Sequence, residues 1–167
     1  MKILTVLTYY RPHVSGLTIY VERLARALAV RGHAVTVLTS QYDHALPRRE
    51  ELHGVRVERV PVLARVSKGV LMPTIGLVAN KLVAGHDALS LHLPQLDASG
   101  IALRGRLMGK PTALTYHSDL TLPGSPVNAV VDRVVDMSNH VAARLCNVLC
   151  AYTEDFARHS RLLSAYM

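Results

Sequence analysis

The sequence predicts an α/β fold: a Rossmann-like, doubly wound parallel sheet covered by helices on both faces. Three observations support this prediction. Short β-rich runs alternate with stretches of helical periodicity along the chain. Several β-rich runs are apolar almost throughout, as expected of parallel strands that are buried on both faces. Glycine, proline and serine stand where the helices should begin and end. The 167 residues, half of them hydrophobic, are enough for one well-packed domain.

The strands are assigned to short runs rich in apolar and β-branched residues. The segment Gln41–Gly54 is polar and is expected to be an exposed loop. The expected strands are Lys2–Thr8, Ala34–Thr39, Val55–Val62, Ala88–His92, Thr112–His117 and Asn147–Tyr152.

The helices are assigned from apolar stripes and from their end signals. Gly32 and Gly109 mark C-terminal ends, while Ser125 and Thr153 are suited to cap N-terminal ends. The expected helices are Leu17–Arg31, roughly Thr74–Ala84, Ala98–Met108, Pro126–Leu145 and Glu154–Ser164. The fourth helix has the clearest stripe, which we expect to pack in the core: Val127, Val130, Val131, Val134, Val135, Val141, Ala142 and Leu145.

The composition favours an anionic ligand. Nineteen Lys and Arg against twelve Asp and Glu give a net charge of +7, which suits phosphate, an anionic membrane surface or nucleic acid. The basic residues are scattered, and there is one Phe and no Trp, so stacking of single-stranded nucleic acid is disfavoured. We therefore expect a phosphate or a lipid headgroup, and no nucleic acid.

Cysteines and apolar runs indicate the compartment. Cys146 and Cys150 are four residues apart; on one strand they would share a face, too far apart to bridge. Buried free thiols suit a reducing cytoplasm, and the sequence has no further Cys or His at metal-ligand spacing. Uninterrupted apolar runs are shorter than a membrane span requires. We expect a cytoplasmic protein that is soluble or peripheral at the inner face of the membrane.

The loop before the first helix is the first candidate site. Ser15 can cap the helix, Gly16 lacks the Cβ that would keep a ligand from the backbone, and Leu17 follows in the first turn. Free N–H groups and the positive end of the helix dipole suit a phosphate. Arg11 and His13 share this loop and are candidates for the cleft, although loop solvation explains His13 equally well.

The second candidate site comes from the rule that open α/β sheets bind ligands outside the carboxyl ends of their strands. His117 and Asp119 follow a predicted strand: the imidazole can bond a hydroxyl or phosphate, and the carboxylate can orient it or accept from a sugar hydroxyl. A cap in which Asp119 accepts from nearby backbone N–H groups is equally open. His92 and Glu154 also follow strands, and Glu154 fits the start of the last helix as well.

Several common nucleotide and hydrolase motifs are missing from the sequence. It has no Walker glycine-lysine loop, three-glycine dinucleotide fingerprint or nucleophile elbow. These absences argue against P-loop NTPases, NAD dehydrogenases and α/β-hydrolases. A flavodoxin-like or response-regulator domain fits the βα alternation but finds no support in the loops.

Several segments taken together resemble the N-terminal domain of family-4 glycosyltransferases, in order along essentially the whole chain. They are Tyr10–Leu17, Tyr20–Ala25, Leu28–Ala29, Arg31–His33, Val35–Thr39, Thr115–Leu120 and Ala151–Glu154. The resemblance implies the GT-B architecture, in which two Rossmann-like domains face a cleft. Residues 1–167 would form the N-terminal, acceptor-side domain, and the C-terminal donor-binding domain is absent from them.

The resemblance also implies roles for individual residues. Ser15 and Gly16 would meet the donor phosphates, His117 would lie near the transferred sugar, and Asp119 would lie beside it. Many relatives have two glycines where this chain has Ser15 and Gly16. The implied activity is retaining, metal-independent hexosyl transfer from a nucleotide-sugar, used as co-substrate without a cofactor, to an unknown acceptor (lipid, glycan or small polyol). The domain alone would be inactive.

The composition and length leave a second interpretation open. The chain could be a non-catalytic binding subunit that docks a separate donor domain or an anionic membrane surface through its basic residues.

Overall fold

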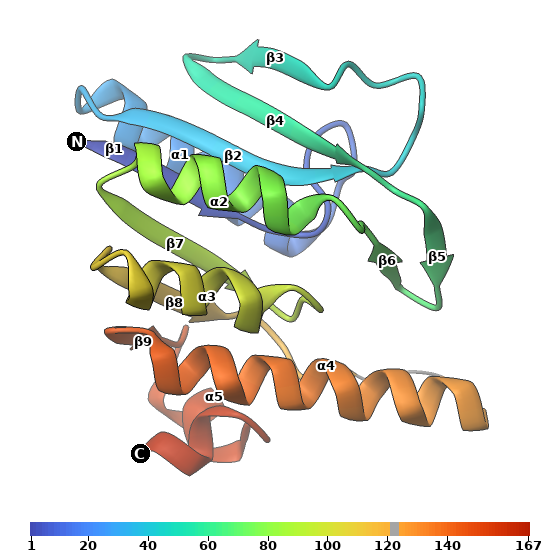
Figure 1. Cartoon of the computed structure of the whole chain (residues 1–167). Helices are drawn as coiled ribbons and strands as arrows, with labels where there is room; N and C mark the ends of the chain where they lie inside the picture. The colour runs from blue at the N-terminus through green and yellow to red at the C-terminus, as the bar shows by residue number, and fades with distance from the viewer. Residues whose placement is uncertain (121–123) are drawn as a thin grey trace.

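The main sheet confirms the predicted α/β fold. The computed structural model describes residues 1–120 and 124–167. Its large sheet contains β1 (Lys2–Val6), β2 (Ala34–Gln41), β3 (Arg49–Leu52), β4 (Val55–Pro61), β7 (Ala88–Leu93), β8 (Thr112–Tyr116) and β9 (Val148–Cys150). The strand order is β3-β4-β2-β1-β7-β8-β9 (Figure 1), and all neighbouring pairs are parallel except β3 with β4. The order changes direction between β1 and β7, which makes this the switch point of a doubly wound sheet.

Helices cover both faces of this sheet. On one face, α1 (Gly16–Val30) packs against β2 and β4. On the other face, α2 (Ile75–Gly85), α3 (Ala98–Leu107) and α4 (Pro126–Leu145) lie side by side (Figure 1). Each layer has its own apolar core. Val21 and Val37 belong to the core under α1, and the core on the opposite face includes Leu91, Ala102 and Leu114.

Three helix starts confirm the predicted caps. The side-chain oxygens of Ser15, Ser125 and Thr153 each accept the N–H three residues further on, at 3.2, 3.1 and 3.1 Å. All three capping residues have extended backbone, as is usual for this position. Gly32 and Gly109 adopt positive φ just after α1 and α3, where glycine ends a helix at little cost.

The segment predicted as an exposed loop contains a strand, so that prediction is wrong in part. β3 pairs antiparallel with β4. The pairing is supported by Arg59, whose fully buried guanidinium forms an ion pair with Glu50. The same guanidinium donates to the carbonyl oxygens of Pro47 (2.9 Å) and Arg11 (2.8 Å). The buried positive charge of Arg59 is thus neutralised by Glu50, nine residues earlier in the chain. No local sequence pattern predicts this ion pair.

A small hairpin was also not predicted. It consists of β5 (Ala64–Val66) and β6 (Gly69–Leu71), which form a separate two-stranded sheet. Three-residue strands carry too little periodicity to be detected from sequence. Tyr9 donates its hydroxyl to the Lys68 carbonyl oxygen (3.1 Å), which ties the hairpin to the end of β1.

The end of the chain differs from the prediction in two ways. The last helix, α5 (Glu154–His159), is shorter than expected, and a 3₁₀ turn follows at Leu163–Tyr166. Ser160 has extended backbone there, and its hydroxyl accepts the N–H groups of Leu162 (3.2 Å) and Leu163 (3.1 Å). Cys146 follows α4 and Cys150 lies on β9, so the two cysteines do not share a strand, in agreement with the predicted bounds of these two elements. Both are half-buried free thiols.

The predicted core stripe of α4 is wrong for half of its residues. Four of the eight are exposed, while the other four are buried or partly buried and face the core side of the helix. The exposed ones are Val127, Val130, Val134 and Val141, and the others are Val131, Val135, Ala142 and Leu145. The buried face also contains Ser138, which donates to the Leu96 carbonyl oxygen (2.6 Å). Figure 1 shows the N-terminal end of α4 projecting beyond the sheet. Among residues 1–120 and 124–167, no helix is both long and apolar enough to cross a membrane.

Candidate functional site

A cavity of about 840 Å³ lies at the carboxyl edge of the sheet. Its walls come from the loops after β1, β7 and β8, the start of α1, the first half of α4, and the β5–β6 hairpin. This position is the switch point between β1 and β7, where doubly wound sheets bind ligands. The predicted site residues that line it are His13, Ser15, Gly16, Leu17 and His117.

The start of α1 forms one wall of the cavity. The Ser15 hydroxyl accepts the Thr18 N–H and lies 2.8 Å from the Thr18 hydroxyl. The N–H groups of Gly16 and Leu17 have no acceptor within the helix. A Cβ built on Gly16 would meet no atom within 4 Å, so the space beside its backbone is open. A phosphate oxygen can therefore approach two N–H groups at the positive end of the helix dipole.

His117 belongs to a chain of four polar side chains. Its Nε2 lies 3.0 Å from Nδ1 of His92, and Nε2 of His92 lies 3.1 Å from the Ser90 hydroxyl. The hydroxyl of Tyr152 bonds Nδ1 of His117. If Tyr152 donates, each neutral imidazole passes one N–H along the chain toward Ser90; the reverse orientation satisfies the same contacts. Both nitrogens of His117 are therefore engaged.

Both histidines are neutral at physiological pH. Burial lowers the pKa of His117 to about 4. Burial, and then the neighbouring His117, lower the pKa of His92 to about 3. His117 therefore acts as a neutral hydrogen-bonding group rather than a cation. Tyr152, which is half exposed and lines the cavity, must move or share its hydrogen bond before a ligand can reach Nδ1.

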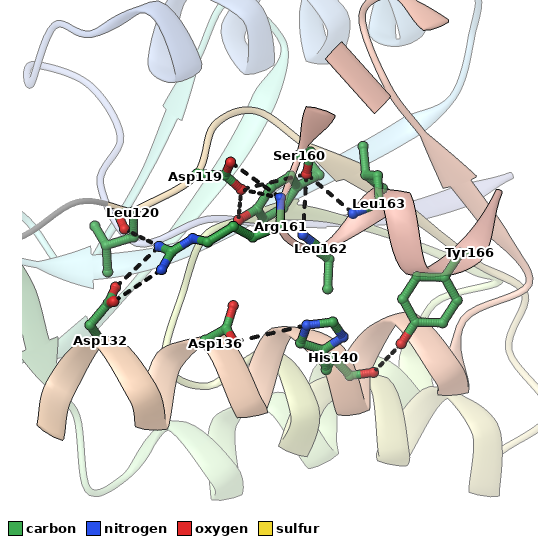
Figure 2. A network of polar contacts seen from close by, with 11 residues as sticks. Asp119, Leu120, Asp132, Asp136, His140, Ser160, Arg161, Leu162, Leu163 and Tyr166 are labelled. Carbon is green, nitrogen blue, oxygen red and sulfur yellow. Dashed lines mark hydrogen bonds and ion pairs between the residues drawn. The ribbon is translucent and has the colours of Figure 1, made fainter. Parts of the chain in front are cut away.

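Asp119 lies in a different network (Figure 2). Its carboxylate accepts the Tyr116 hydroxyl (3.0 Å) and the Arg161 N–H (3.2 Å). The Arg161 guanidinium in turn forms an ion pair with Asp132 (3.3 Å) and donates to the Leu120 carbonyl oxygen. Asp119 is not among the described residues that line the cavity. The backbone N–H that it accepts lies 42 residues further along the chain, so this contact is not the local cap that the sequence offered as the alternative. The predicted catalytic role gains no support from this position and stays a prediction.

The other predicted residues are also engaged elsewhere. Arg11 donates through Nε to Glu22 (2.8 Å), and Glu154 accepts from Arg158 on the surface of α5 (3.1 Å). Neither is among the described residues that line the cavity. His92 is completely buried behind His117, so it supports that residue rather than meeting a ligand directly.

The structure adds two lining residues that the sequence reasoning missed, Gln95 and Asp97 on the loop between β7 and α3. Burial raises the pKa of Asp97 to about 6. The strand-end rule that selected His92 also reaches these residues, and it was not extended beyond Pro94. Within the described ranges, no group of three or more His, Cys, Asp or Glu side chains is placed to hold a metal ion.

Comparison with known proteins identifies relatives. The family described as "Glycosyl transferase 4-like domain" matches residues 15–165. A GDP-mannose-dependent alpha-mannosyltransferase of Mycolicibacterium smegmatis is 28% identical over 126 residues, which make up 72% of this chain and 33% of that protein.

A solved structure supports the fold, and a second solved structure is a weaker match. Sucrose-phosphate synthase from Thermosynechococcus elongatus superposes with a TM-score of 0.57 at 18% identity, over 89% of this chain and 41% of that one. MurG of Acinetobacter baumannii superposes with a TM-score of 0.49 at 15% identity, over 90% of this chain and 40% of that one. The chain thus spans about a third of the mannosyltransferase and two fifths of the sucrose-phosphate synthase chain, and its Rossmann-like fold is that of one half of a GT-B glycosyltransferase. It belongs to the glycosyl transferase 4-like domain family.

Proposed function

We propose that this chain is the acceptor-side domain of a retaining, metal-independent glycosyltransferase that uses a nucleotide-sugar. One observation carries the proposal: the open start of α1 and the neutral His117 line the same cavity at the switch point of the sheet. The start of α1 can bind a phosphate, and His117 can form a hydrogen bond with a sugar hydroxyl. The cavity therefore offers a binding group for each side of a sugar–phosphate bond.

In this proposal the chain contributes positioning and electrostatics. When the sugar–phosphate bond breaks, negative charge grows on the leaving phosphate. The N–H groups of Gly16 and Leu17 and the dipole of α1 stabilise that charge without needing to rearrange. The nucleotide itself would be held by a second, donor-binding domain, so we expect the 167 residues alone to be inactive. The name of the mannosyltransferase relative makes GDP-mannose the first donor to test.

The test compares two glycines that have equally open surroundings. Gly16 lies in the cavity, and Gly85 lies at the far end of α2; a Cβ on either meets no atom within 4 Å. With a donor-binding domain supplied, Gly16→Ala should lower kcat/KM for transfer from GDP-mannose about tenfold, because the methyl group displaces a phosphate that would lie against the backbone. Gly85→Ala should leave it unchanged. Equal rates for both variants would contradict the phosphate assignment.

The role of His117 has its own test. His117→Ala should reduce transfer by about 10²-fold while the circular dichroism spectrum and the unfolding midpoint remain near those of the parent. Transfer at the parental rate would remove His117 from the site. If the 167 residues without a donor-binding domain transfer mannose, the proposed division between two domains is wrong.

A second candidate function is docking to an anionic membrane surface at the inner face of the membrane. The apolar side chains exposed along α4 recur at spacings of three and four residues, flanked by the exposed Arg133 and Arg144. They are Val127, Val130, Val134, Met137 and Val141.

This candidate is tested by sedimentation with vesicles. The chain should bind phosphatidylglycerol vesicles and not phosphatidylcholine vesicles. Met137→Glu should abolish the binding, and the control Leu77→Glu, at an exposed leucine of α2, should not. Failure to bind phosphatidylglycerol would reject the membrane and leave a separate donor domain as the partner of this face.

A further inference from the structure

We infer that Gln95 and Asp97 form the subsite that binds hydroxyl groups of the acceptor, so that the acceptor presents a polyhydroxylated ring, such as a sugar or a cyclitol, to this wall. The inference rests on the proposed function, because that function assigns the cavity to a donor and an acceptor. The proposed function leaves the acceptor open as a lipid, a glycan or a small polyol. The inference specifies the chemical group of that acceptor that contacts Gln95 and Asp97.

The first step is the unusual position of Asp97. It is the residue before α3, where an aspartate normally accepts an N–H of the first helical turn. Here it makes no such bond, and the Ser99 N–H donates instead to the Ser138 hydroxyl of α4 (3.2 Å). Ser15, which lines the same cavity at the start of α1, has extended backbone and caps its helix. Asp97 has φ −86° and ψ 4° and does not.

The second step is the state of the carboxylate. Among residues 1–120 and 124–167, Asp97 has no hydrogen-bond or ion-pair partner, although its side chain is half-buried and lines the cavity. Burial alone raises its pKa to about 6. A carboxylate that has lost part of its water and gained no donor is suited to accept a hydrogen bond from a ligand.

The third step is the neighbouring amide. Gln95 is 5% exposed and lines the same wall, and its Nε2 is buried without an acceptor in the described part of the chain. The two side chains thus offer a donor and an acceptor on one short loop. A hydroxyl group donates and accepts at once, so it matches this pair.

The fourth step excludes an anion at this wall. Asp97 is ionised above pH 6 and would repel a phosphate placed against it. The basic lining side chains, Arg65 and Lys68, come from the β5–β6 hairpin, and the open start of α1 supplies the N–H groups. Charge therefore assigns phosphate to those walls and neutral hydroxyl groups to the Gln95–Asp97 wall.

The experiment is an NMR titration of the 167-residue chain, with methyl α-D-mannopyranoside and myo-inositol as polyhydroxylated probes and GDP as the donor-side probe. At least one polyhydroxylated probe should shift the Gln95 side-chain amide and the Asp97 carboxyl carbon. It should also lower the pKa of Asp97, because a ligand hydroxyl favours the charged form. Asp97→Asn should weaken that probe at least tenfold and change the GDP affinity less than twofold.

The matched control is Asp155→Asn, which removes the same charge from an exposed position on α5 that is not among the described lining residues. It should change neither affinity. The inference is overturned if neither polyhydroxylated probe shifts Asp97 at 100 mM, or if Asp97→Asn binds the probe as well as the parent does. If GDP fails to bind while the probe depends on Asp97, the hydroxyl subsite stands, and the phosphate assignment is decided by the comparison of Gly16→Ala with Gly85→Ala. The carboxyl shift is read in the parent protein, so the outcome does not depend on how the variant folds.

Discussion

Asp97 and Asp119 occupy comparable places in the sequence, but their carboxylates differ in the hydrogen bonds that they accept in the fold. Each follows the carboxyl end of one of two neighbouring parallel strands, β7 and β8. Asp119 accepts the Tyr116 hydroxyl and an N–H from Arg161, 42 residues further along the chain. Asp97 accepts nothing from the described residues and lines the cavity. Position at a strand end therefore selects candidates, whereas distant segments determine which carboxylate is left for a ligand.

The difference has an energetic counterpart. A carboxylate that satisfies internal donors stabilises the folded state, while one that is partly desolvated without partners destabilises it. We therefore expect Asp119 to serve stability and Asp97 to cost stability in return for a free acceptor. Four measurements test this difference between the two carboxylates.

The largest effect should come from removing the Asp119 side chain. Asp119→Ala should lower the free energy of unfolding by about 2–3 kcal/mol, because the Tyr116 hydroxyl and the Arg161 N–H lose their acceptor. Urea denaturation at pH 7 measures it, and Asp155→Ala, an exposed aspartate of α5, serves as the control. A loss below about 0.5 kcal/mol, the range of ordinary surface substitutions, would show that the network in Figure 2 does not stabilise the fold.

The next effect should have the opposite sign. The pKa of Asp97 is raised from 3.8 to about 6, so its ionisation opposes folding as pH rises. After discounting for partial exposure, Asp97→Asn should stabilise the protein by about 1 kcal/mol at pH 8 and have almost no effect at pH 3.5. The difference should develop between pH 4 and pH 6. A stabilisation that is the same at both pH values would mean that the charge is not its cause.

A smaller quantity is the coupling between the two aspartates. They share no hydrogen-bond partner in the described residues, so their effects on stability should add within about 0.5 kcal/mol. Unfolding of Asp97→Asn, Asp119→Ala and the double variant at pH 8 gives the coupling. A larger coupling would show that both carboxylates belong to one site. Asp119 would then lie beside the cleft, as the resemblance implied.

The smallest effect concerns His117, which is two residues from Asp119 but bonds His92 and Tyr152 instead. When Tyr152 is the donor, its hydroxyl stabilises the neutral form of His117, so Tyr152→Phe should raise the pKa of His117 from about 4 by a few tenths of a unit. A lower pKa would show that His117 donates to Tyr152 instead. Asp119→Asn should leave this pKa unchanged. NMR titration of the imidazole distinguishes the two, and the reverse pattern would make His117 and Asp119 a functional pair after all.

Local patterns account for the parts of the fold that could be predicted. The caps at Ser15, Ser125 and Thr153 each involve an N–H three residues away, and the alternation of apolar runs identifies the parallel strands. The strand β3 was missed because it depends on the buried Arg59 and its partner Glu50. The exposed valines of α4 were wrongly predicted to be buried. Periodicity predicts an apolar face of a helix, but it does not predict whether another element covers that face.

The candidate site divides in the same way. From the sequence alone, the loop at Ser15 and Gly16 could be selected as the candidate for a phosphate, because a helix start and an open backbone are properties of consecutive residues. The sequence also determined that His117 reaches the carboxyl edge of the sheet. The contacts between distant segments became visible only in the fold. His92 and Tyr152 bond the two nitrogens of His117, and Arg161 engages Asp119. Asp97 lines the cavity without a side-chain partner among the described residues. The contacts of His117 and Asp119 join segments far apart in the chain, and packing, rather than local preference, brings them together.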